Sequence, residues 1–394
     1  MNYIQQDFSV QFSYKVFFTE FLFSLENRLF NDLLESVHEE GIMRKILFVI
    51  DENITIHFPK LGEQIDTYFK DNPYVKLVPE KVIVAGGEIA KNEERFLTTI
   101  IDAVNEHGID RHSYIVGIGG GSVLDLTGYA AAISHRGIKL IRVATTVLSQ
   151  DDSGVGVKNG VNYKGKKNFL GTFVPPFAVF NDYHFLTTLS DRDWVSGISE
   201  AIKVALIKDA AFFDWLEQHA EQLANRDKEA TQYMIKRCAE LHMDHIAGGD
   251  PFEFGSSRPL DFGHWSAHKL EQITDFKVLH GEAVAMGIAL DTVYSNLVGS
   301  LSETETNRVI TLLKTIGLPL SHEYMNLTSA DDPIFAGLRE FQEHLGGRLT
   351  IMLLKSIGTG YEVHELDAQL IMKASQILRN AQESPNQQKQ PLSC

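Results

Sequence analysis

A series of short apolar runs, separated by helical patterns, constrains the fold of the first half of the chain more than any other feature. The runs are rich in β-branched residues and bounded by turn residues, which is typical of buried strands. They cover Arg44–Asp51, Lys81–Ala85, Ser113–Ile118, Leu140–Ala144 and Phe177–Asn181. Helical spacing occurs between them, for example over Asn92–His107. We therefore expect an α/β fold with a mostly parallel sheet and helices on both faces.

The pattern changes near Leu189, where we expect the α/β domain to end. From Asp191 to Asp250 there is no proline and almost no glycine, and helical periodicity dominates to about Asn380. The phenylalanine-rich segment Ser9–Phe23 predicts a strand pair that extends the edge of the sheet. The predicted parts are an α/β domain over residues 1–188, an α-helical domain over residues 189–380 and a disordered polar tail over residues 381–394.

The charge and the cysteine content exclude several classes of protein. The 394 residues carry 36 Lys+Arg against 52 Asp+Glu, a formal net charge of -16, so we expect no general attraction to nucleic acid or to anionic membranes. An anionic substrate then needs a local basic pocket. The presence of only two cysteines, without a secretory signal or a long apolar run, favours a cytoplasmic protein that does not span a membrane.

Gly117–Asp125 (GIGGGSVLD) follows a predicted strand and opens into a predicted helix. Such a turn lets the backbone and the helix N-terminus approach a pyrophosphate. The strict G-x-G-x-x-G fingerprint fails because Ser122 takes the place of the third glycine, so a tight turn without a ligand is the alternative. Polar residues also end two other strands, in DEN at residues 51–53 and in GGE-x-x-K at residues 86–91. Together these strand ends predict a dinucleotide crevice.

A group of histidines and carboxylates in the second half has the composition of a metal site. His264 and His268 lie on one face of a predicted helix, at i and i+4, and His280 begins the next apolar helix. Glu200 and Lys203 share a face of an earlier helix. Three neutral or anionic ligands with an open position suit a catalytic zinc. Hydrogen-bonded histidines of a helical core are the alternative, and the spacing does not say which histidines bind a metal.

Lysines are concentrated in Gln150–Gly171, a glycine-rich segment that we expect to be a loop. Its polar members include Lys158, Lys164, Lys166, Lys167 and Asn168. In so acidic a chain, this concentration indicates an anion-binding loop, and a solvated loop is the alternative. Arg136 before it and Lys355 near the end of the chain are further candidate cations.

The order of these motifs resembles that of the sugar-phosphate cyclase superfamily, of which 3-dehydroquinate synthase is the best-known type. The resemblance runs from about Leu47 to Ile357, in GGE-x-x-K, GGGS-x-x-D, HRG, TT-x-L-x-Q-x-DS-x-V-x-K, KN-x-x-G-x-F, E-x-x-K, GH-x-x-x-H and HGEAV. It implies a homodimeric enzyme, a carbon–oxygen lyase acting on phosphates. It also implies an NAD-binding α/β domain and a helical domain that binds metal and substrate.

The resemblance assigns roles to individual residues. The implied zinc ligands, with cobalt as a substitute metal, are Glu200, His264 and His280. The expected cofactor-binding residues are Asp51, Asn53, Glu88, Lys91, Gly120, Gly121, Ser122, Asp125, Thr145, Thr146, Leu148, Lys167, Thr188 and Leu189. The phosphorylated ketose substrate would meet Asp152, Lys158, Asn168, Lys203, Arg258, Asp261, His268 and Lys355, and a neighbouring subunit would supply Arg136.

The implied reaction is redox-neutral, so that the dinucleotide is a catalyst rather than a consumed substrate. Transient oxidation of a hydroxyl acidifies the adjacent C–H, phosphate leaves by β-elimination, the hydride returns, and an intramolecular aldol step closes a carbocycle. Zinc is the Lewis acid in this scheme. The lysines, Asn168 and His268 would hold the phosphate, and His268 would assist proton transfer.

Two positions depart from the 3-dehydroquinate synthase pattern. Asp261 replaces an asparagine in a segment that is one residue shorter, and His242 replaces a lysine. In that enzyme type these positions surround a substrate carboxylate, which a gained aspartate and a lost cation should repel. The run RPLDFGHWSAHKLE is similar to the 2-epi-5-epi-valiolone synthase branch of C7-cyclitol synthases. We therefore expect sedoheptulose 7-phosphate as the substrate.

Three alternatives stay open. The first is 3-dehydroquinate synthase itself, which acts on a heptulosonate phosphate. The second is a metal-dependent polyol dehydrogenase, which would accumulate NADH and would need no phosphate-binding lysines. The third is a non-catalytic binding protein, against which stand the intact residues Glu200, His264, His280, Lys158 and Lys203.

Overall fold

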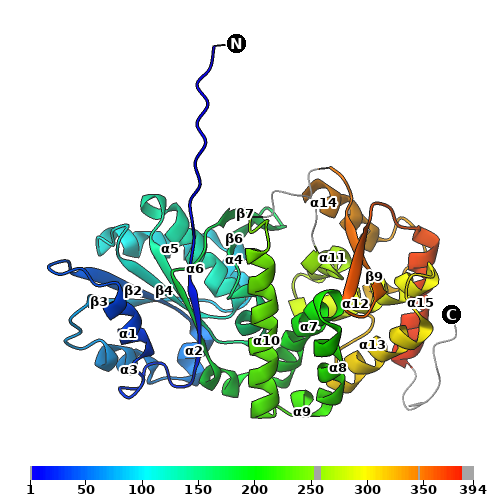
Figure 1. Ribbon diagram of the computed structural model, residues 1–394, viewed down its shortest axis with the longest axis horizontal. Coiled ribbons are helices and arrows are strands. Elements are labelled where there is room, and N and C mark those ends of the chain that lie inside the picture. Colours follow the sequence, from blue (N-terminus) through cyan, green and yellow to red (C-terminus); the bar gives the residue numbers. More distant parts are fainter. Residues whose placement is uncertain (1, 253–258, 345–346, 384–394) are drawn as a thin grey trace.

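The computed structural model describes residues 2–252, 259–344 and 347–383. Its first half is built on a six-stranded sheet in the order β1-β8-β5-β4-β2-β3, in which all neighbouring strands are parallel (Figure 1). The strands are β1 (Lys15–Thr19), β2 (Arg44–Asp51), β3 (Val75–Val84), β4 (Tyr114–Gly119), β5 (Lys139–Ala144) and β8 (Ala178–Asp182). The predicted parallel sheet is confirmed.

The sheet is buried on both faces. Phe48 and Val49, successive residues of β2, belong to two different hydrophobic cores because side chains of a strand alternate between its faces. The core around Phe48 includes residues of α1 (Leu29–Ser36) and α3 (Leu61–Tyr68). The core around Val49 includes residues of α5 (Glu94–Glu106) and α6 (Gly121–Ile133). The short helices α2 (Glu52–His57) and α4 (Ile89–Asn92) follow β2 and β3.

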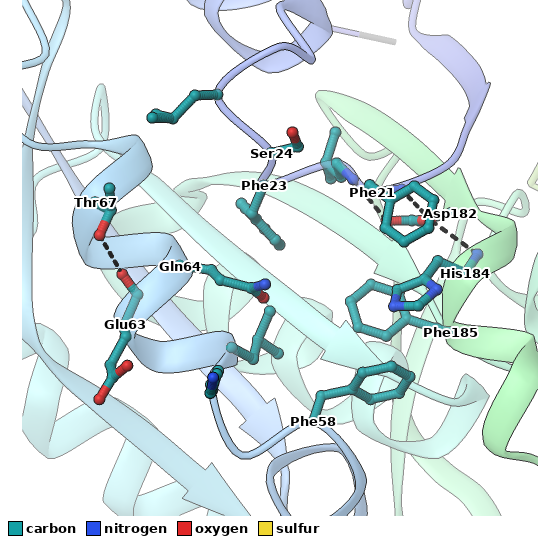
Figure 2. A pocket seen from close by; sticks show the side chains of 14 residues that line it. Phe21, Phe23, Ser24, Phe58, Glu63, Gln64, Thr67, Asp182, His184 and Phe185 are labelled. Atoms are coloured by element: carbon teal, nitrogen blue, oxygen red, sulfur yellow. Dashed lines mark hydrogen bonds between the residues drawn. The ribbon is translucent and has the colours of Figure 1, made fainter.

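Residues 9–23 contain one strand, β1, which extends the edge of the sheet as predicted, but the predicted strand pair is wrong. β1 pairs with β8 at the edge of the sheet, and the preceding residues extend away from the body of the molecule (Figure 1). The carboxylate of Asp182, at the end of β8, accepts hydrogen bonds from the backbone N–H groups of Phe21 (3.0 Å) and Leu22 (2.8 Å) (Figure 2). These bonds hold the chain in a turn and end the strand.

The lysine-rich segment is a hairpin rather than the predicted loop. A short helical turn, η2 (Ser149–Ser153), leads to the antiparallel strands β6 (Lys158–Tyr163) and β7 (Lys166–Phe173). The fully buried guanidinium of Arg142, on β5, anchors the segment that leads into the hairpin. It donates to carbonyl oxygens of Ser153, Gly154, Gly156 and Lys158 and to the side chain of Asn159.

The second half is mainly helical, as predicted. Its α-helices, among the described residues, are α7 (Asp191–Lys208), α8 (Ala210–Gln218), α9 (Ala220–Ala224), α10 (Lys228–Ala247), α11 (His264–Ile273), α12 (His280–Leu297), α13 (Glu303–Ile316), α14 (Ala336–His344) and α15 (Ala368–Glu383). A hairpin of β9 (Ile351–Ser356) and β10 (Thr359–Val363) is an addition that the helical pattern did not predict. Residues 384–394 of the predicted tail lie outside the described residues.

α12 is the central helix of this half. It is buried along most of its length and packs against α7, α11, α13 and α15 (Figure 1). Within the described ranges, no helix combines the length and the apolar character that a membrane crossing requires. The first residue of α12 is His280.

Candidate active site

Three helices bring the predicted metal ligands together. Glu200 lies on α7, His264 begins α11 and His280 begins α12. The Nε2 atoms of His264 and His280 lie 3.8 and 3.5 Å from Glu200 Oε1, and the three ligand atoms lie within 4.8 Å of one another. Glu200 is fully buried, and among the described residues its Oε1 atom has no hydrogen-bond donor. An orphaned carboxylate oxygen beside two imidazole nitrogens fits a divalent metal such as zinc.

Glycines allow these helices to approach so closely. A Cβ atom on Gly281, the residue after His280, would lie 1.9 Å from the carbonyl oxygen of Ser196 on α7. A Cβ atom on Gly287 would lie 1.9 Å from the carbonyl oxygen of Gly263, which precedes α11 and has a φ of +77°. The backbone of α12 therefore touches both elements that carry the other two ligands.

Hydrogen bonds orient both ligand histidines. Nδ1 of His264 lies 3.0 Å from the carbonyl oxygen of Phe262, which requires a proton on Nδ1 and leaves Nε2 available to a metal. Nδ1 of His280 lies 3.1 Å from Oε2 of Glu271, and Glu271 Oε1 accepts a hydrogen bond from Lys167 at 2.5 Å. Burial and nearby positive charges lower the pKa of His264 well below its usual value, so this imidazole is neutral and suited to metal binding.

His268 belongs to a second, overlapping group of potential ligands. Its ring centroid lies 5.3 Å from that of His264 and 5.9 Å from that of His280. His268, Glu271 and His280 also present ligand atoms within reach of one ion. Because Glu271 is already paired with Lys167, the group around Glu200 is the better candidate, and His268 stays available to a substrate. Burial first, and Lys167 second, lower the pKa of His268, so this ring too is neutral.

Lys203, Asp152 and His242 form a charged cluster beside Glu200. Lys203 pairs with Glu200, and its Nζ atom lies 3.9 Å from Oδ1 of Asp152. Nδ1 of His242 lies 2.8 Å from the same oxygen. Burial disfavours the charged form of Lys203, but the negative charges of Glu200 and Asp152 outweigh burial and raise the pKa of Lys203. Asp261 also contributes to this rise. Lys203 and His242 in turn outweigh burial and lower the pKa of Asp152.

The predicted cofactor residues gather at the carboxyl end of the sheet. Ser122 donates to Glu88 at 3.0 Å, and Lys91 donates to Asp125 at 2.8 Å. α6 begins after Gly120 without a side-chain cap, which leaves its N-terminal N–H groups to an anion. The other predicted members of this set follow the ends of β2, β4 and β5 or lie in the segment before α7, namely Asp51, Asn53, Gly121, Thr145, Thr146, Leu148, Thr188 and Leu189.

The lysines of the lysine-rich segment point in different directions, and its binding of an anion stays a prediction. Lys167 points into the site, toward Glu271, and Asn168 accepts a hydrogen bond from Lys91. Lys164 and Lys166, near the turn of the hairpin, lie over exposed aromatic rings at 5.4 and 5.6 Å from the ring centroids. The alternation of side chains along β7 sends neighbouring lysines in opposite directions.

Four other predicted residues stay predictions as site residues of this chain. Lys158 and Lys355 have exposed side chains, on β6 and β9. Arg136 follows α6 and precedes the amino end of β5, whereas the cofactor residues follow the carboxyl ends of the strands, so it lies away from the site of its own chain. Arg258 lies outside the described residues.

Sequence reasoning missed several buried carboxylates, among them Glu271 and Asp291. Glu271 follows His264 by two helical turns, so the shared helix face was a usable signal. Asp291, on α12, accepts hydrogen bonds from the backbone N–H of Gly263 (3.0 Å) and from the indole N–H of Trp265 (2.9 Å). No local pattern marks Asp291, because its partners lie 28 and 26 residues away.

A separate cavity of about 500 Å³ lies between the end of β1, the start of α3 and the segment after β8 (Figure 2). Phe58, His184 and Phe185 line one side of it, and Gln64 and Asp182 contribute polar groups. None of the predicted site residues lines this cavity. The candidate site is therefore the metal cluster with the strand-end residues, not the cavity.

Comparison with known proteins identifies the family. Residues 81–196 match the family model of the 3-dehydroquinate synthase N-terminal domain, and residues 197–335 match that of the C-terminal domain. The 3-dehydroquinate synthase of Pseudoalteromonas atlantica is 36% identical over 307 residues, which cover 76% of this chain and 82% of that protein. The chain belongs to the 3-dehydroquinate synthase family. The family that the sequence motifs predicted is thus confirmed.

Two solved structures resemble this member of the family over almost its whole length. ValA (2-epi-5-epi-valiolone synthase) from Streptomyces hygroscopicus subsp. jinggangensis 5008, with NAD+ and Zn2+ bound, has a TM-score of 0.85 and 28% identity, covering 96% of this chain and 100% of that one. A 2-deoxy-scyllo-inosose synthase complexed with carbaglucose-6-phosphate, NAD+ and Co2+ has a TM-score of 0.74 and 23% identity, covering 91% and 95%. These likenesses confirm the predicted fold class.

Proposed function

We propose that this chain is a sugar-phosphate cyclase, a carbon–oxygen lyase that uses NAD and zinc to expel phosphate from a phosphorylated ketose and close a carbocycle. The observation that carries the proposal is the convergence of Glu200, His264 and His280 beside the charged pair of Lys203 and Asp152. Family membership supports it, as do the NAD+ with Zn2+ or Co2+ in the two structural relatives.

The bound groups would supply Lewis-acid polarisation of a substrate oxygen and a reversible hydride acceptor. The protein's own residues do the rest. Lys203 stays charged beside Glu200 and Asp152, and from there it can donate a hydrogen bond to a substrate oxygen. His268 stays neutral, so it can accept a proton and return it. Asp152, held charged by Lys203 and His242, can accept hydrogen bonds from substrate hydroxyls.

The identity of the substrate is the finer part of the proposal. The names of the sequence relatives favour 3-dehydroquinate synthase, the alternative from the sequence, over a C7-cyclitol synthase. The charges at the site favour the other reading. His242 is tied to Asp152, and Asp261 adds to the acidic charge around Lys203. A substrate carboxylate would meet repulsion there, whereas hydroxyl groups would find acceptors.

We therefore infer that sedoheptulose 7-phosphate is the substrate, with 3-dehydroquinate synthase activity as the second candidate. The likeness to ValA supports the first and the sequence relatives support the second. We also propose that the protein is a homodimer and that it is located in the cytoplasm. The buried free thiol of Cys238 is compatible with a reducing compartment.

One experiment separates these functions. The enzyme is incubated with NAD and Zn2+ and with either sedoheptulose 7-phosphate or the C7 heptulosonate phosphate, and free phosphate and product mass are measured. We expect phosphate release from the ketose and a C7 cyclitol as product. Release from the heptulosonate phosphate alone would establish 3-dehydroquinate synthase activity instead. Lasting NADH with a simple polyol, without phosphate release, would indicate the dehydrogenase.

Two variants sharpen this test. The double variant His242→Lys with Asp261→Asn introduces the lysine and the asparagine that the 3-dehydroquinate synthase pattern has at these positions. We expect it to raise use of the heptulosonate phosphate relative to sedoheptulose 7-phosphate by about 10-fold or more, the effect of about 1.4 kcal/mol of relieved repulsion. Lys203→Met is the matched control, because it should lower the turnover of both substrates without changing their ratio.

A further inference from the structure

One ion pair joins the β6–β7 hairpin to the metal cluster. Lys167, on β7, donates to Oε1 of Glu271 on α11 at 2.5 Å. The other oxygen of Glu271 lies 3.1 Å from Nδ1 of His280, whose Nε2 faces Glu200 at 3.5 Å. The side chains of Lys167 and Glu271 are only 11% and 4% exposed, so water screens the pair little.

The same hairpin reaches the predicted cofactor residues at its other side. Asn168, the residue after Lys167, accepts a hydrogen bond from Lys91. Asn162, on β6, donates to Glu88 at 2.7 Å and accepts from the backbone N–H of Asn168 at 2.8 Å. The hairpin therefore stands between the strand-end residues of the α/β half and the metal histidine of the helical half.

The two oxygens of Glu271 serve different partners, so the position of one constrains the other. A metal on Nε2 of His280 would fix the imidazole ring and hence the Nδ1–H group that Glu271 accepts. A fixed and charged Glu271 holds Lys167, and with it the backbone of β7. Without Lys167, the buried carboxylate of Glu271 would lose much of the positive charge that offsets the cost of its desolvation. The hairpin is therefore expected to respond when the metal site gains or loses its metal.

We propose that Lys167 and Glu271 couple metal binding to dinucleotide binding through the β6–β7 hairpin. The inference rests on the proposed function for the identity of both ligands. Because coupling between two binding equilibria is reciprocal, each ligand should raise the affinity for the other by the same factor. Glu271 is thus a positioning residue, which acts on the metal through His280 and on the cofactor crevice through Lys167.

The experiment measures the dissociation constant of NAD by calorimetry, with metal-stripped enzyme and with Zn2+-saturated enzyme. For the unmodified chain we expect Zn2+ to tighten NAD binding by about 5-fold or more. In Lys167→Met and in Glu271→Gln this ratio should fall toward one, even where the affinity for NAD itself also changes. Lys166→Met is the matched control, since Lys166 is exposed and lies over a ring outside the site, and it should keep the full ratio.

A second measurement separates coupling from general damage. Zn2+ affinity should fall by about 10-fold or more in Glu271→Gln, the usual effect of losing the partner of a ligand histidine, while circular dichroism stays unchanged. A ratio of one in the unmodified chain, or a full ratio in Lys167→Met, would overturn the coupling. Failure of the unmodified chain to bind one Zn2+ or NAD at all would instead overturn the proposed function.

Discussion

Asp291 shows how a single buried side chain can hold a ligand helix in place. Both of its carboxylate oxygens accept hydrogen bonds, one from the backbone of Gly263 and one from the indole of Trp265. These partners flank His264 in the sequence, so Asp291 orients the first turn of α11 without touching a substrate. An asparagine has the same shape as the ionised carboxylate but offers an N–H group to one of the two donors, so Asp291→Asn should disturb this turn at a pH where the aspartate is ionised.

The protonation of Asp291 predicts a pH dependence. Burial raises the pKa of Asp291 from 3.8 to about 7, so the folded chain keeps a proton between about pH 4 and pH 7 that the unfolded chain has lost. The contribution of this group to the free energy of unfolding therefore falls as the pH rises through that window and levels off above it. Urea unfolding of the wild type and of Asp291→Asn, from about pH 5 to pH 8, should give a difference that declines up to about pH 7. A constant difference would contradict the prediction.

At the scale of elements, the site depends on contacts between helix backbones. α12 meets α7 at Gly281 and the start of α11 at Gly287, and each contact is too close for any side chain. The three ligands are therefore positioned less by their own side chains than by the distance between helix axes. A change in that distance of a few tenths of an ångström moves a ligand atom by a comparable amount.

Gly287→Ala tests this dependence. Its new methyl group would have to push the start of α11 away, so we expect weaker Zn2+ binding and a loss of about 1–3 kcal/mol in the free energy of unfolding. Gly62→Ala is the matched control, because a Cβ atom there, on α3, meets nothing within 4 Å. The control should gain about 0.4–1 kcal/mol from the lower entropy of the unfolded chain. Equal effects of the two changes would show that the close contact does not matter.

At the scale of the whole molecule, Arg136 lies at the amino ends of the strands, away from the candidate site of its own chain. It follows α6 at the amino end of β5, whereas the cofactor residues follow the carboxyl ends of the strands. The family resemblance assigns Arg136 to the site of a neighbouring subunit, which requires a homodimer. The large apolar residues Ile4 and Phe8 of the N-terminal segment are 97% and 83% exposed in the single chain.

Mixing two inactive variants tests this arrangement. Arg136→Met would damage the partner's site, and Lys203→Met would damage the site of its own chain. If subunits exchange at random in a two-fold dimer, half of the dimers are mixed and each has one intact site, so about a quarter of wild-type activity should return. Light scattering should give about twice the chain mass of 44.2 kDa. A monomer, or no recovery of activity in refolded mixtures, would refute the shared site.

Most of the architecture could be predicted from local patterns. The strand β2 was predicted with its observed bounds, Arg44–Asp51, because a continuous apolar run between turn residues has few other solutions. The hairpin of β6 and β7 could not, because glycines and lysines with little alternation are typical of loops. It is held by long-range contacts, above all by the buried Arg142.

The sequence by itself determined the parallel α/β half, the helical half and the residue types of a metal and dinucleotide site. Strand alternation, helix spacing and motif order are properties of neighbouring residues, so they can be recognised without coordinates. Only the tertiary structure decided that Lys167 meets Glu271, 104 residues away, while Lys166 faces outward. It also decided that Asp291 holds the start of α11 and that Gly281 and Gly287 set the distance between the ligand helices. Such contacts depend on how the whole chain packs, and no local pattern encodes them.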